Sequence, residues 1–313
     1  MIKHISVGID IGSRTTRLVV AENKNGENNP VVLSLISMPT HGVRHGYIIN
    51  PDETKKVIAS SIREAEKISN VSIKKALVSI GGISLSSVVL SSYTMVSRAD
   101  KEITELDIDK AVNEAQKSLD LINRKIIFKN IISYKIDNIE SISNPLGMKA
   151  VKLEVKVLFV YCLEQHINLL EDIFLENQIE IVDIIPSPIA GAMAVLTERQ
   201  KSVGVCLVNI GAETVSVVVY ENNVVIGLHV FNIGSSDITN DIALGFKIPL
   251  NEAEFLKVGT KDSNEKRKLE DIIDARLSDI FELINKYLKK IKRNELLPAG
   301  IVLTGGGSSL SIM

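Results

Sequence analysis

The feature that most constrains the fold is a self-match at an offset of 199 residues. Positions 10–23 and 209–222 each read as two strands joined by a short glycine turn. Seven of the fourteen aligned pairs are identical: Ile11/Ile210, Gly12/Gly211, Thr15/Thr214, Val19/Val218, Val20/Val219, Glu22/Glu221 and Asn23/Asn222. A repeated supersecondary unit with this separation predicts two related domains.

The repeated turn is suited to an anion. Glycine at the bend permits positive φ and lets the backbone approach a ligand closely. Consecutive backbone N–H groups in such a turn can form a concave nest for phosphate oxygens. A single turn of this kind is more often an ordinary hairpin turn, because glycine is a default turn residue. The duplication instead favours two facing nests that hold the phosphates of one nucleotide.

Side chains beside these turns add to the prediction. Thr15, Thr16 and Thr214 supply hydroxyl donors. Asp10, at the end of the first strand, is placed to hold Mg²⁺ through water, because Mg²⁺ keeps much of its hydration shell.

A third glycine cluster, Gly305, Gly306 and Gly307, follows the apolar run Ile301–Leu303. It can bring the backbone close to an adenine or a ribose. No dinucleotide fingerprint or Walker A pattern is present. His41 and His45 stand four apart on a glycine-containing loop with no further ligands nearby, so a metal site is not predicted there.

Composition excludes several classes of function. The 313 residues are 45% apolar and 24% charged, which is typical of a globular protein of about two domains. The net charge of -2, the 4% aromatic content and the absence of Trp argue against nucleic-acid binding. No apolar run is long enough to span a membrane, and the first residues do not resemble a signal peptide. Cys162 and Cys206 lie in strand-like apolar runs, which predicts buried, reduced thiols in the cytoplasm.

Four segments together resemble a known superfamily. Ile9–Gly12, Asn209–Gly211, Pro188–Ala192 and Thr304–Gly307 resemble the phosphate-1, phosphate-2, connect-1 and adenosine motifs of the actin-like ATPases. Within that superfamily the chain most resembles the FtsA family of bacterial cell-division proteins. The narrower match is carried by Gly42–Asn50, Leu85–Ala150 with its Asn144–Gly147, Asp241–Ala243 and Glu252–Val258.

The resemblance implies an α/β, actin-like (ribonuclease-H-like) two-domain fold with an inserted small α+β subdomain. We expect the first domain at 1–83 and 161–198, with the inserted subdomain at 84–160. The second domain would occupy 199–313, with a helical subdomain near 238–297. Only six residues follow Gly307, where this fold continues with a helix and strands. We therefore expect the C-terminal part to be missing.

The resemblance also implies ATP and Mg²⁺ as ligands. Phosphate and Mg²⁺ would be contacted from the first domain by Asp10, Gly12, Ser13, Thr15 and Thr16, and phosphate from the second domain by Gly211 and Thr214. The ribose and base would be reached by Glu254 and Lys257, which stand on one helix. The adenosine would be backed by the glycine loop of Gly305, Gly306 and Gly307.

The implied partners are the tubulin-like FtsZ and further copies of the chain in actin-like protofilaments. FtsZ would contact the subdomain between about Ile238 and Leu297. The implied location is the cytoplasmic face of the cell membrane at the division site. Direct membrane contact is expected only if an amphipathic helix exists beyond Met313.

Three departures from the superfamily pattern bear on catalysis. Asn209 stands where the phosphate-2 motif carries Asp, and an amide cannot act as a general base. Glu213 adds a carboxylate near the phosphates, and Ser187 stands where hydrolytic relatives orient water with Glu or Gln. We therefore expect at most a weak ATPase.

Two other functions share parts of the pattern. A pilus-assembly actin-like adaptor would have a similar inserted subdomain. An exopolyphosphatase-like phosphohydrolase would share the motif of Asp10–Ser13 followed by Arg17–Val20. The sequence ranks both behind the cell-division function.

Overall fold

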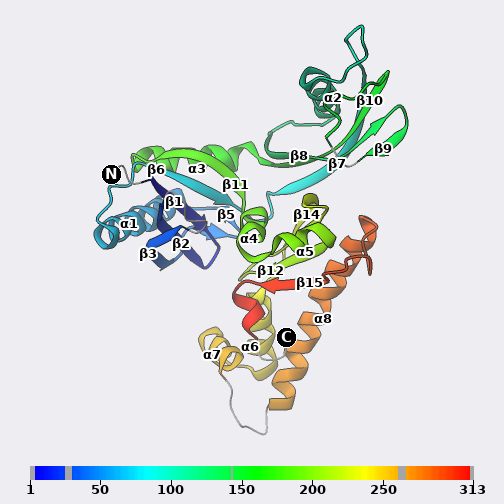
Figure 1. Cartoon of the computed structure of the whole chain (residues 1–313). Helices are drawn as coiled ribbons and strands as arrows, with labels where there is room; N and C mark the ends of the chain where they lie inside the picture. The colour runs from blue at the N-terminus through cyan, green and yellow to red at the C-terminus, as the bar shows by residue number, and fades with distance from the viewer. Residues whose placement is uncertain (1–3, 25–29, 142–143, 260–265, 311–313) are drawn as a thin grey trace.

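Two sheets with the same internal arrangement form the centre of the molecule (Figure 1). The computed structural model describes residues 4–24, 30–141, 144–259 and 266–310. The first sheet has the order β11-β6-β1-β2-β3 and the second the order β14-β13-β12-β15. The strands of the first are β1 (His4–Ile11), β2 (Thr15–Asn23), β3 (Val31–Pro39), β6 (Lys75–Ile80) and β11 (Glu180–Pro186). Those of the second are β12 (Val205–Ile210), β13 (Val215–Glu221), β14 (Val224–Phe231) and β15 (Ile301–Thr304).

The two sheets are built by the same rule. Each begins with three antiparallel strands, and a later strand then pairs parallel with the first strand of the three. The repeated segments are β1–β2 and β12–β13, so the sequence repeat corresponds to a repeated sheet. The parallel strands β1, β6 and β11 end at the same edge of the sheet, so the residues that follow these strands lie close together.

Helices join the two sheets into one core. α1 (Pro51–Ser69) and α3 (Glu164–Glu176) pack beside the first sheet, and α4 (Ser187–Val195) contacts strands of both. One continuous buried cluster includes Val78 in the first sheet, Ile189 in α4 and Val218 in the second sheet. The junction between the halves is therefore packed at the α4 end.

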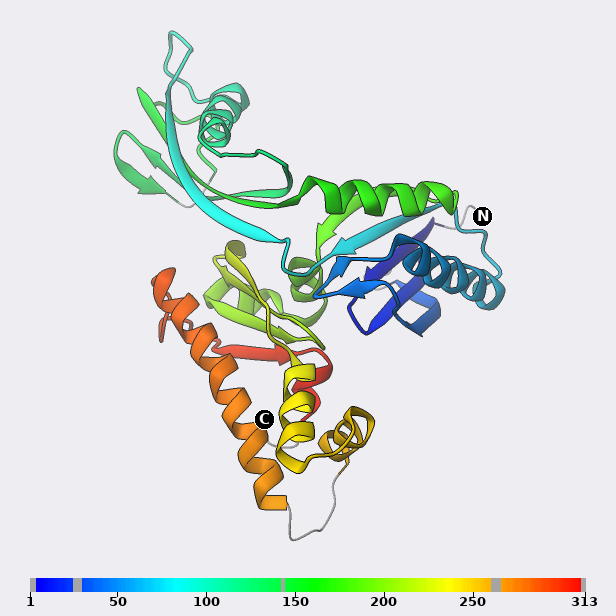
Figure 2. The same cartoon turned by 180° about the vertical axis from the view of Figure 1, so that it is seen from behind.

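A small unit is inserted between β6 and α3. It has a sheet of order β7-β10-β8-β9, one helix and a separate apolar core, and it projects away from the two central sheets (Figure 2). Its elements are β7 (Ser86–Met95), α2 (Glu105–Lys117), β8 (Arg124–Ile136), β9 (Ile139–Ser141) and β10 (Lys152–Leu163). They fall largely within the predicted inserted segment, whose end points remain a prediction.

The start of α2 holds a buried charge. Asp107 is fully buried and accepts hydrogen bonds from the hydroxyls of Ser97 and Thr104 at 2.8 and 2.7 Å, as well as from both backbone amides. Burial alone would raise the pKa of this carboxyl, but the hydrogen bonds outweigh it and lower the pKa to about 2. The carboxylate thus ties the β7–α2 connection to the first turn of the helix.

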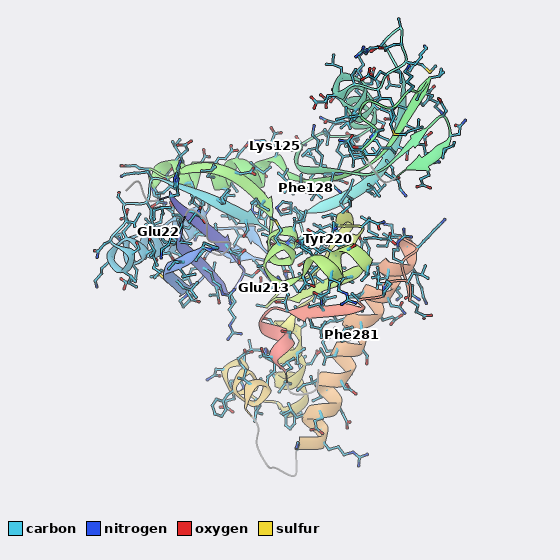
Figure 3. All side chains as sticks on the ribbon, viewed as in Figure 1. Glu22, Lys125, Phe128, Glu213, Tyr220 and Phe281 are labelled. Carbon is cyan, nitrogen blue, oxygen red and sulfur yellow. The ribbon has the colours of Figure 1, made fainter. Side chains whose placement is uncertain are left out.

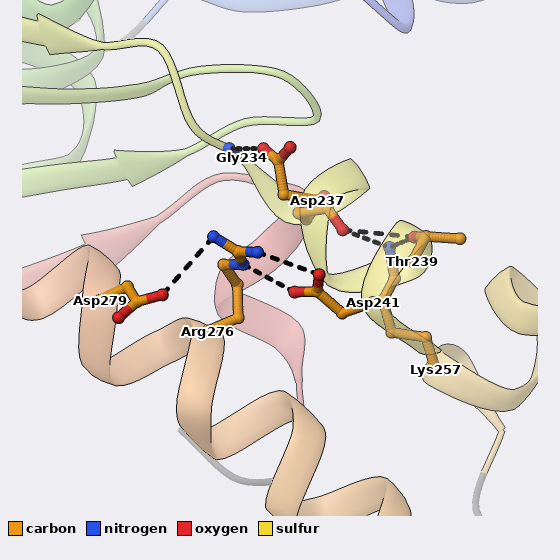
Figure 4. Close-up of polar contacts among 8 residues, drawn as sticks. Gly234, Asp237, Thr239, Asp241, Lys257, Arg276 and Asp279 are labelled. Carbon is orange, nitrogen blue, oxygen red and sulfur yellow. Dashed lines mark hydrogen bonds and ion pairs between the residues drawn. The ribbon is translucent and has the colours of Figure 1, made fainter. Parts of the chain in front are cut away.

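Three helices lie between β14 and β15 of the second sheet: α6 (Ser235–Phe246), α7 (Leu250–Val258) and α8 (Lys266–Lys290). An apolar stripe of α8 packs as a core face, with Ile273, Leu277, Ile280 and Ile284 buried. Arg276 of α8 forms a two-point ion pair with Asp241 of α6 at 2.7 and 2.9 Å (Figure 4).

The remaining elements are short: β4 (Val43–Arg44), β5 (Tyr47–Ile48), α5 (Glu198–Val203) and the 3-10 turn η1 (Gly306–Ser309). Cys162 and Cys206 are free and buried, as predicted. Burial raises the pKa of both thiols to about 12, so neither is a nucleophile at neutral pH. Among the described residues, no helix is both long and apolar enough to cross a membrane.

Candidate functional site

The two repeated turns have the same internal hydrogen bond. The amide of Gly12 donates to the carbonyl of Thr15 at 3.2 Å, and the amide of Gly211 donates to the carbonyl of Thr214 at 2.9 Å. Neither glycine has positive φ, contrary to one reason for expecting glycine here. The structure gives another reason, since a Cβ at either position would lie 2.9 Å from the carbonyl oxygen three residues on.

Each turn leaves two consecutive amides unpaired. Within the described ranges, the backbone N–H groups of Ser13, Arg14, Ala212 and Glu213 donate to no protein acceptor. Two adjacent free donors in a tight turn are what an anion nest requires. Both turns therefore present two adjacent backbone donors, and phosphate binding by them stays a prediction.

The second turn is fixed from behind by α6. The amides of Ser235 and Ser236 donate to the carbonyls of Gly211 and Ala212 at 2.9 and 2.7 Å. Gly234 allows this close approach, because a Cβ there would lie 2.7 Å from the amide nitrogen of Glu213. The turn is thus held in one conformation before any ligand arrives.

Asp10 and Thr16 lie on opposite faces of the first sheet. Asp10 is half-buried, pairs in register with Arg17 and Ser79, and accepts a hydrogen bond from the Ser79 hydroxyl. Thr16 is fully buried, and its hydroxyl lies 2.8 Å from that of Thr40. Because neighbouring strand residues point to opposite faces, Asp10 faces away from the interior in which the Thr16 hydroxyl is engaged.

The first turn touches the loop between β4 and β5. The hydroxyl of Ser13 accepts a hydrogen bond from the amide of Gly46 at 2.8 Å, which leaves its own proton free to donate. The neighbouring amide of His45 donates across the junction to the Glu213 carboxylate at 2.5 Å. His45 Nδ1 also lies 3.3 Å from the Glu213 carbonyl oxygen. The two halves are therefore bridged next to both turns.

Glu254 and Lys257 form one network on α7. The Lys257 ammonium is almost fully buried and contacts the Thr239 hydroxyl at 2.7 Å (Figure 4). It also contacts the Ser235 carbonyl at 3.0 Å and the Glu254 carboxylate at 2.7 Å. Burial would raise the pKa of Glu254, but hydrogen bonds from Lys257 and Thr239 and the nearby charges lower it. All three protons of Lys257 are used, so this residue also fixes the position of Glu254.

Glu254 also bridges the two halves. Its carboxylate pairs with the Arg14 guanidinium of the first turn at 2.8 Å. The sequence predicts the ribose-side role of Glu254 but gives no sign of this pair. Arg14 and His45 are residues of the site that sequence reasoning did not assign to it. Glu213 was expected only as a carboxylate near the phosphates, and its contact with the opposite half is new.

The glycine cluster lies against the second turn. Gly305 has a φ of 90°, and a Cβ there would lie 2.5 Å from the carbonyl oxygen of Ile210. Gly306 faces open space. Asn209 pairs in register with Thr304, so the strand before this cluster runs beside the second turn.

Ser187 lies near the edge where β6 ends. A Cβ added at Gly81 would meet the Ser187 hydroxyl at 2.5 Å. No group of three His, Cys, Asp or Glu side chains arranged for a metal occurs within the described ranges, which includes the surroundings of His41 and His45.

Solved structures place this architecture in a class. A PilM-PilN type IV pilus biogenesis complex is similar with a TM-score of 0.69 and 20% identity, over 98% of this chain and 82% of that one. MreB5 of Spiroplasma citri bound to ADP is similar with a TM-score of 0.53 and 12% identity, over 97% and 85%. The chain thus has the actin-like two-domain fold, with the small α+β unit inserted in its first half.

Sequence relatives identify the family within that class. Residues 206–311 match the family "Cell division protein FtsA", and residues 85–161 match "SHS2 domain inserted in FTSA". The cell-division protein FtsA of Pseudomonas aeruginosa is 30% identical over 97% of this chain and 78% of its own length. That of Bacillus subtilis is 27% identical over 97% and 74%. The chain belongs to the FtsA family of cell-division proteins, which confirms the resemblance seen in the sequence.

Proposed function

We propose that this chain binds ATP with Mg²⁺ between its two halves and uses the bound state to assemble with FtsZ during cell division. The single observation that carries the nucleotide part is the pair of matched turns, each with two free amides, bridged to the opposite half at His45–Glu213 and Arg14–Glu254. Free donors on both sides of one junction suit a linear polyphosphate better than a single phosphate.

In the proposed complex, the two turns hold phosphate oxygens through the amides of Ser13, Arg14, Ala212 and Glu213. The hydroxyls of Ser13, Thr15 and Thr214 add donors, and Asp10 holds Mg²⁺ through water. Glu254, fixed by Lys257, accepts from the ribose hydroxyls, and Gly305, Gly306 and Gly307 back the base. Thr16 takes no part, because its hydroxyl is paired with Thr40.

Turnover in this site is slow or absent. Asn209 cannot accept a proton from water, and Ser187 is too short to hold the attacking water as Gln or Glu would. Binding without hydrolysis suits a protein whose nucleotide stabilises an assembly rather than drives a cycle.

The proposed FtsZ surface is the helical segment around α6 and α7. Four large apolar side chains are exposed there: Leu244, Leu250, Phe255 and Val258. Clustered exposed apolar residues mark protein contact sites more often than isolated ones do. By analogy with its family, the chain is also proposed to assemble with further copies of itself into actin-like protofilaments. The surface around α6 and α7 is proposed for FtsZ alone.

The nucleotide part is tested by titrating a fluorescent ATP analogue in the presence of Mg²⁺. We expect saturable binding that is weakened at least about tenfold in Asp10→Ala, whereas Asp109→Ala, an exposed change in α2, binds like the unmodified chain. The FtsZ part is tested by pull-down with a peptide from the FtsZ C-terminus. Equal capture by the unmodified chain and by Leu250→Glu would contradict the proposed surface.

A further inference from the structure

The site contains an anion of its own. Glu213 belongs to the second turn and lies where the two halves meet (Figure 3). Its carboxylate accepts a hydrogen bond from the amide of His45 in the other half. A carboxylate carries the same sign of charge as a phosphate and uses the same kind of donor. The position therefore raises the question of what happens to Glu213 when a nucleotide enters.

Both ends of this contact are built rigidly. On one side, the carbonyl of His45 accepts from the amide of Ile83 at 3.1 Å, and the adjacent Gly46 amide is held by Ser13 at 2.8 Å. Gly82 lets the two loops meet, since a Cβ there would lie 2.5 Å from the His45 carbonyl oxygen. His45 itself has a φ of 50°, so its amide is presented by a turn that the surrounding contacts maintain.

On the other side, the backbone of Glu213 is fixed by α6 through the carbonyls of Gly211 and Ala212. The two side chains are half-buried, which shields the contact in part from water. Among the described residues the Glu213 carboxylate has no hydrogen-bond partner besides the His45 amide, whereas its backbone and the His45 loop are each tied to their own half. Displacing this carboxylate is then the simplest way to break this bridge.

We propose that Glu213 is a further affinity-determining residue of the nucleotide site, which holds the His45 amide in the nucleotide-free protein and leaves it when phosphate oxygens enter. This inference rests on the proposed nucleotide function. The entering phosphates repel the carboxylate and offer the His45 amide a replacement acceptor. Releasing Glu213 from the His45 amide costs part of the binding free energy. The apparent affinity for nucleotide is therefore lower than the affinity that the two turns alone would give.

Displacement of Glu213 and simple charge repulsion by Glu213 predict different effects of two substitutions. Glutamine at this position removes the charge but keeps an oxygen that can accept from His45, whereas alanine removes both. Displacement predicts a larger gain in affinity for alanine than for glutamine. Simple repulsion predicts equal gains.

The experiment compares Glu213→Ala, Glu213→Gln and the exposed control Glu105→Ala in the full chain. Hydrogen–deuterium exchange of residues 41–50 is measured without nucleotide, and affinities are measured for Mg-ATP and for inorganic tripolyphosphate. We expect faster exchange at the His45 amide and an affinity gain of about tenfold for both ligands in Glu213→Ala. Glu213→Gln should show a smaller gain and near-normal exchange, and Glu105→Ala no change.

Unchanged exchange in Glu213→Ala, or equal affinity gains for the alanine and glutamine variants, would overturn the inference. If no variant bound nucleotide, the proposed function and the displacement would both be contradicted. The exchange at His45, which needs no ligand, would still decide whether Glu213 holds the loop.

Discussion

Gly12 and Gly211 lie 199 residues apart and perform the same structural task. Each donates its amide to the carbonyl three residues later, and each sits where a Cβ would meet that carbonyl oxygen at 2.9 Å. The correspondence shows that the two turns are the same construction used twice. A substitution that strains the turn at Gly12 should therefore strain the turn at Gly211 in the same way.

Substituting either glycine should strain its turn. We expect Gly12→Ala to lower the free energy of unfolding by about 1–3 kcal/mol, because the new methyl group meets a carbonyl oxygen fixed by the β1–β2 hairpin. The measurement is urea denaturation followed by circular dichroism. Gly306→Ala is the matched control and should stay within about 0.5 kcal/mol, because a Cβ at Gly306 faces open space.

Restoring an acid at position 209 should restore catalytic capacity. We expect Asn209→Asp to raise the rate of phosphate release above that of the unmodified chain, because a carboxylate can accept a proton or bind Mg²⁺-bound water. Released phosphate is measured under single-turnover conditions with Mg-ATP. A Val208→Ile variant, changed in the same strand without a new charge, should release phosphate at the original rate. Fast turnover by the unmodified chain would contradict the assignment of Asn209 as the limiting departure.

The buried carboxylate of Asp107 should support the inserted unit. Replacing it with Asn leaves an amide N–H₂ facing hydroxyl and amide donors, so we expect a loss of about 1–3 kcal/mol within that unit. Hydrogen exchange measured across α2 locates the loss. Asp109→Asn removes an exposed carboxylate from the same helix and should leave the exchange unaltered; a similar effect of both changes would argue against the role of burial.

Acid should destabilise the first half through His166. Burial lowers the pKa of this imidazole from 6.5 to about 4, and Ser84 contacts its Nδ1 at 2.8 Å. The unfolded chain therefore binds a proton at a higher pH than the folded chain does. The stability from a neutral His166 is present above pH 6.5 and is lost as the pH falls towards 4, by at most about 3 kcal/mol.

The pH dependence is measured as the urea midpoint between pH 7.5 and 4.5. His166→Gln should flatten this dependence, although it lowers the overall stability. His41→Gln changes an exposed histidine and should leave the slope as it is. An unchanged slope in His166→Gln would contradict the assignment.

The sequence predicts the parts of the site that depend on local pattern. The repeat identifies both turns and predicts two related domains. Family membership follows from motifs that lie in order along the chain. These features are carried by residues close together in sequence, where strand and helix periods apply.

Other parts of the site depend on tertiary packing. The contact of His45 with Glu213 joins residues 168 positions apart, and no local pattern encodes it. Thr16 reads as a phosphate donor only because it stands next to Thr15, whereas strand alternation turns it into the interior. Gly12 was expected for its backbone freedom and is needed for space instead, which depends on where the Thr15 carbonyl lies.

The central claim is that both turns hold one triphosphate between the halves. The most direct measurement is a crystal structure of the chain with Mg²⁺ and a non-hydrolysable ATP analogue. The account predicts phosphate oxygens within hydrogen-bond distance of the amides of Ser13 or Arg14 and also of Ala212 or Glu213, with the Glu213 carboxylate moved off His45. A nucleotide that contacts one turn only, or binds elsewhere, would contradict it.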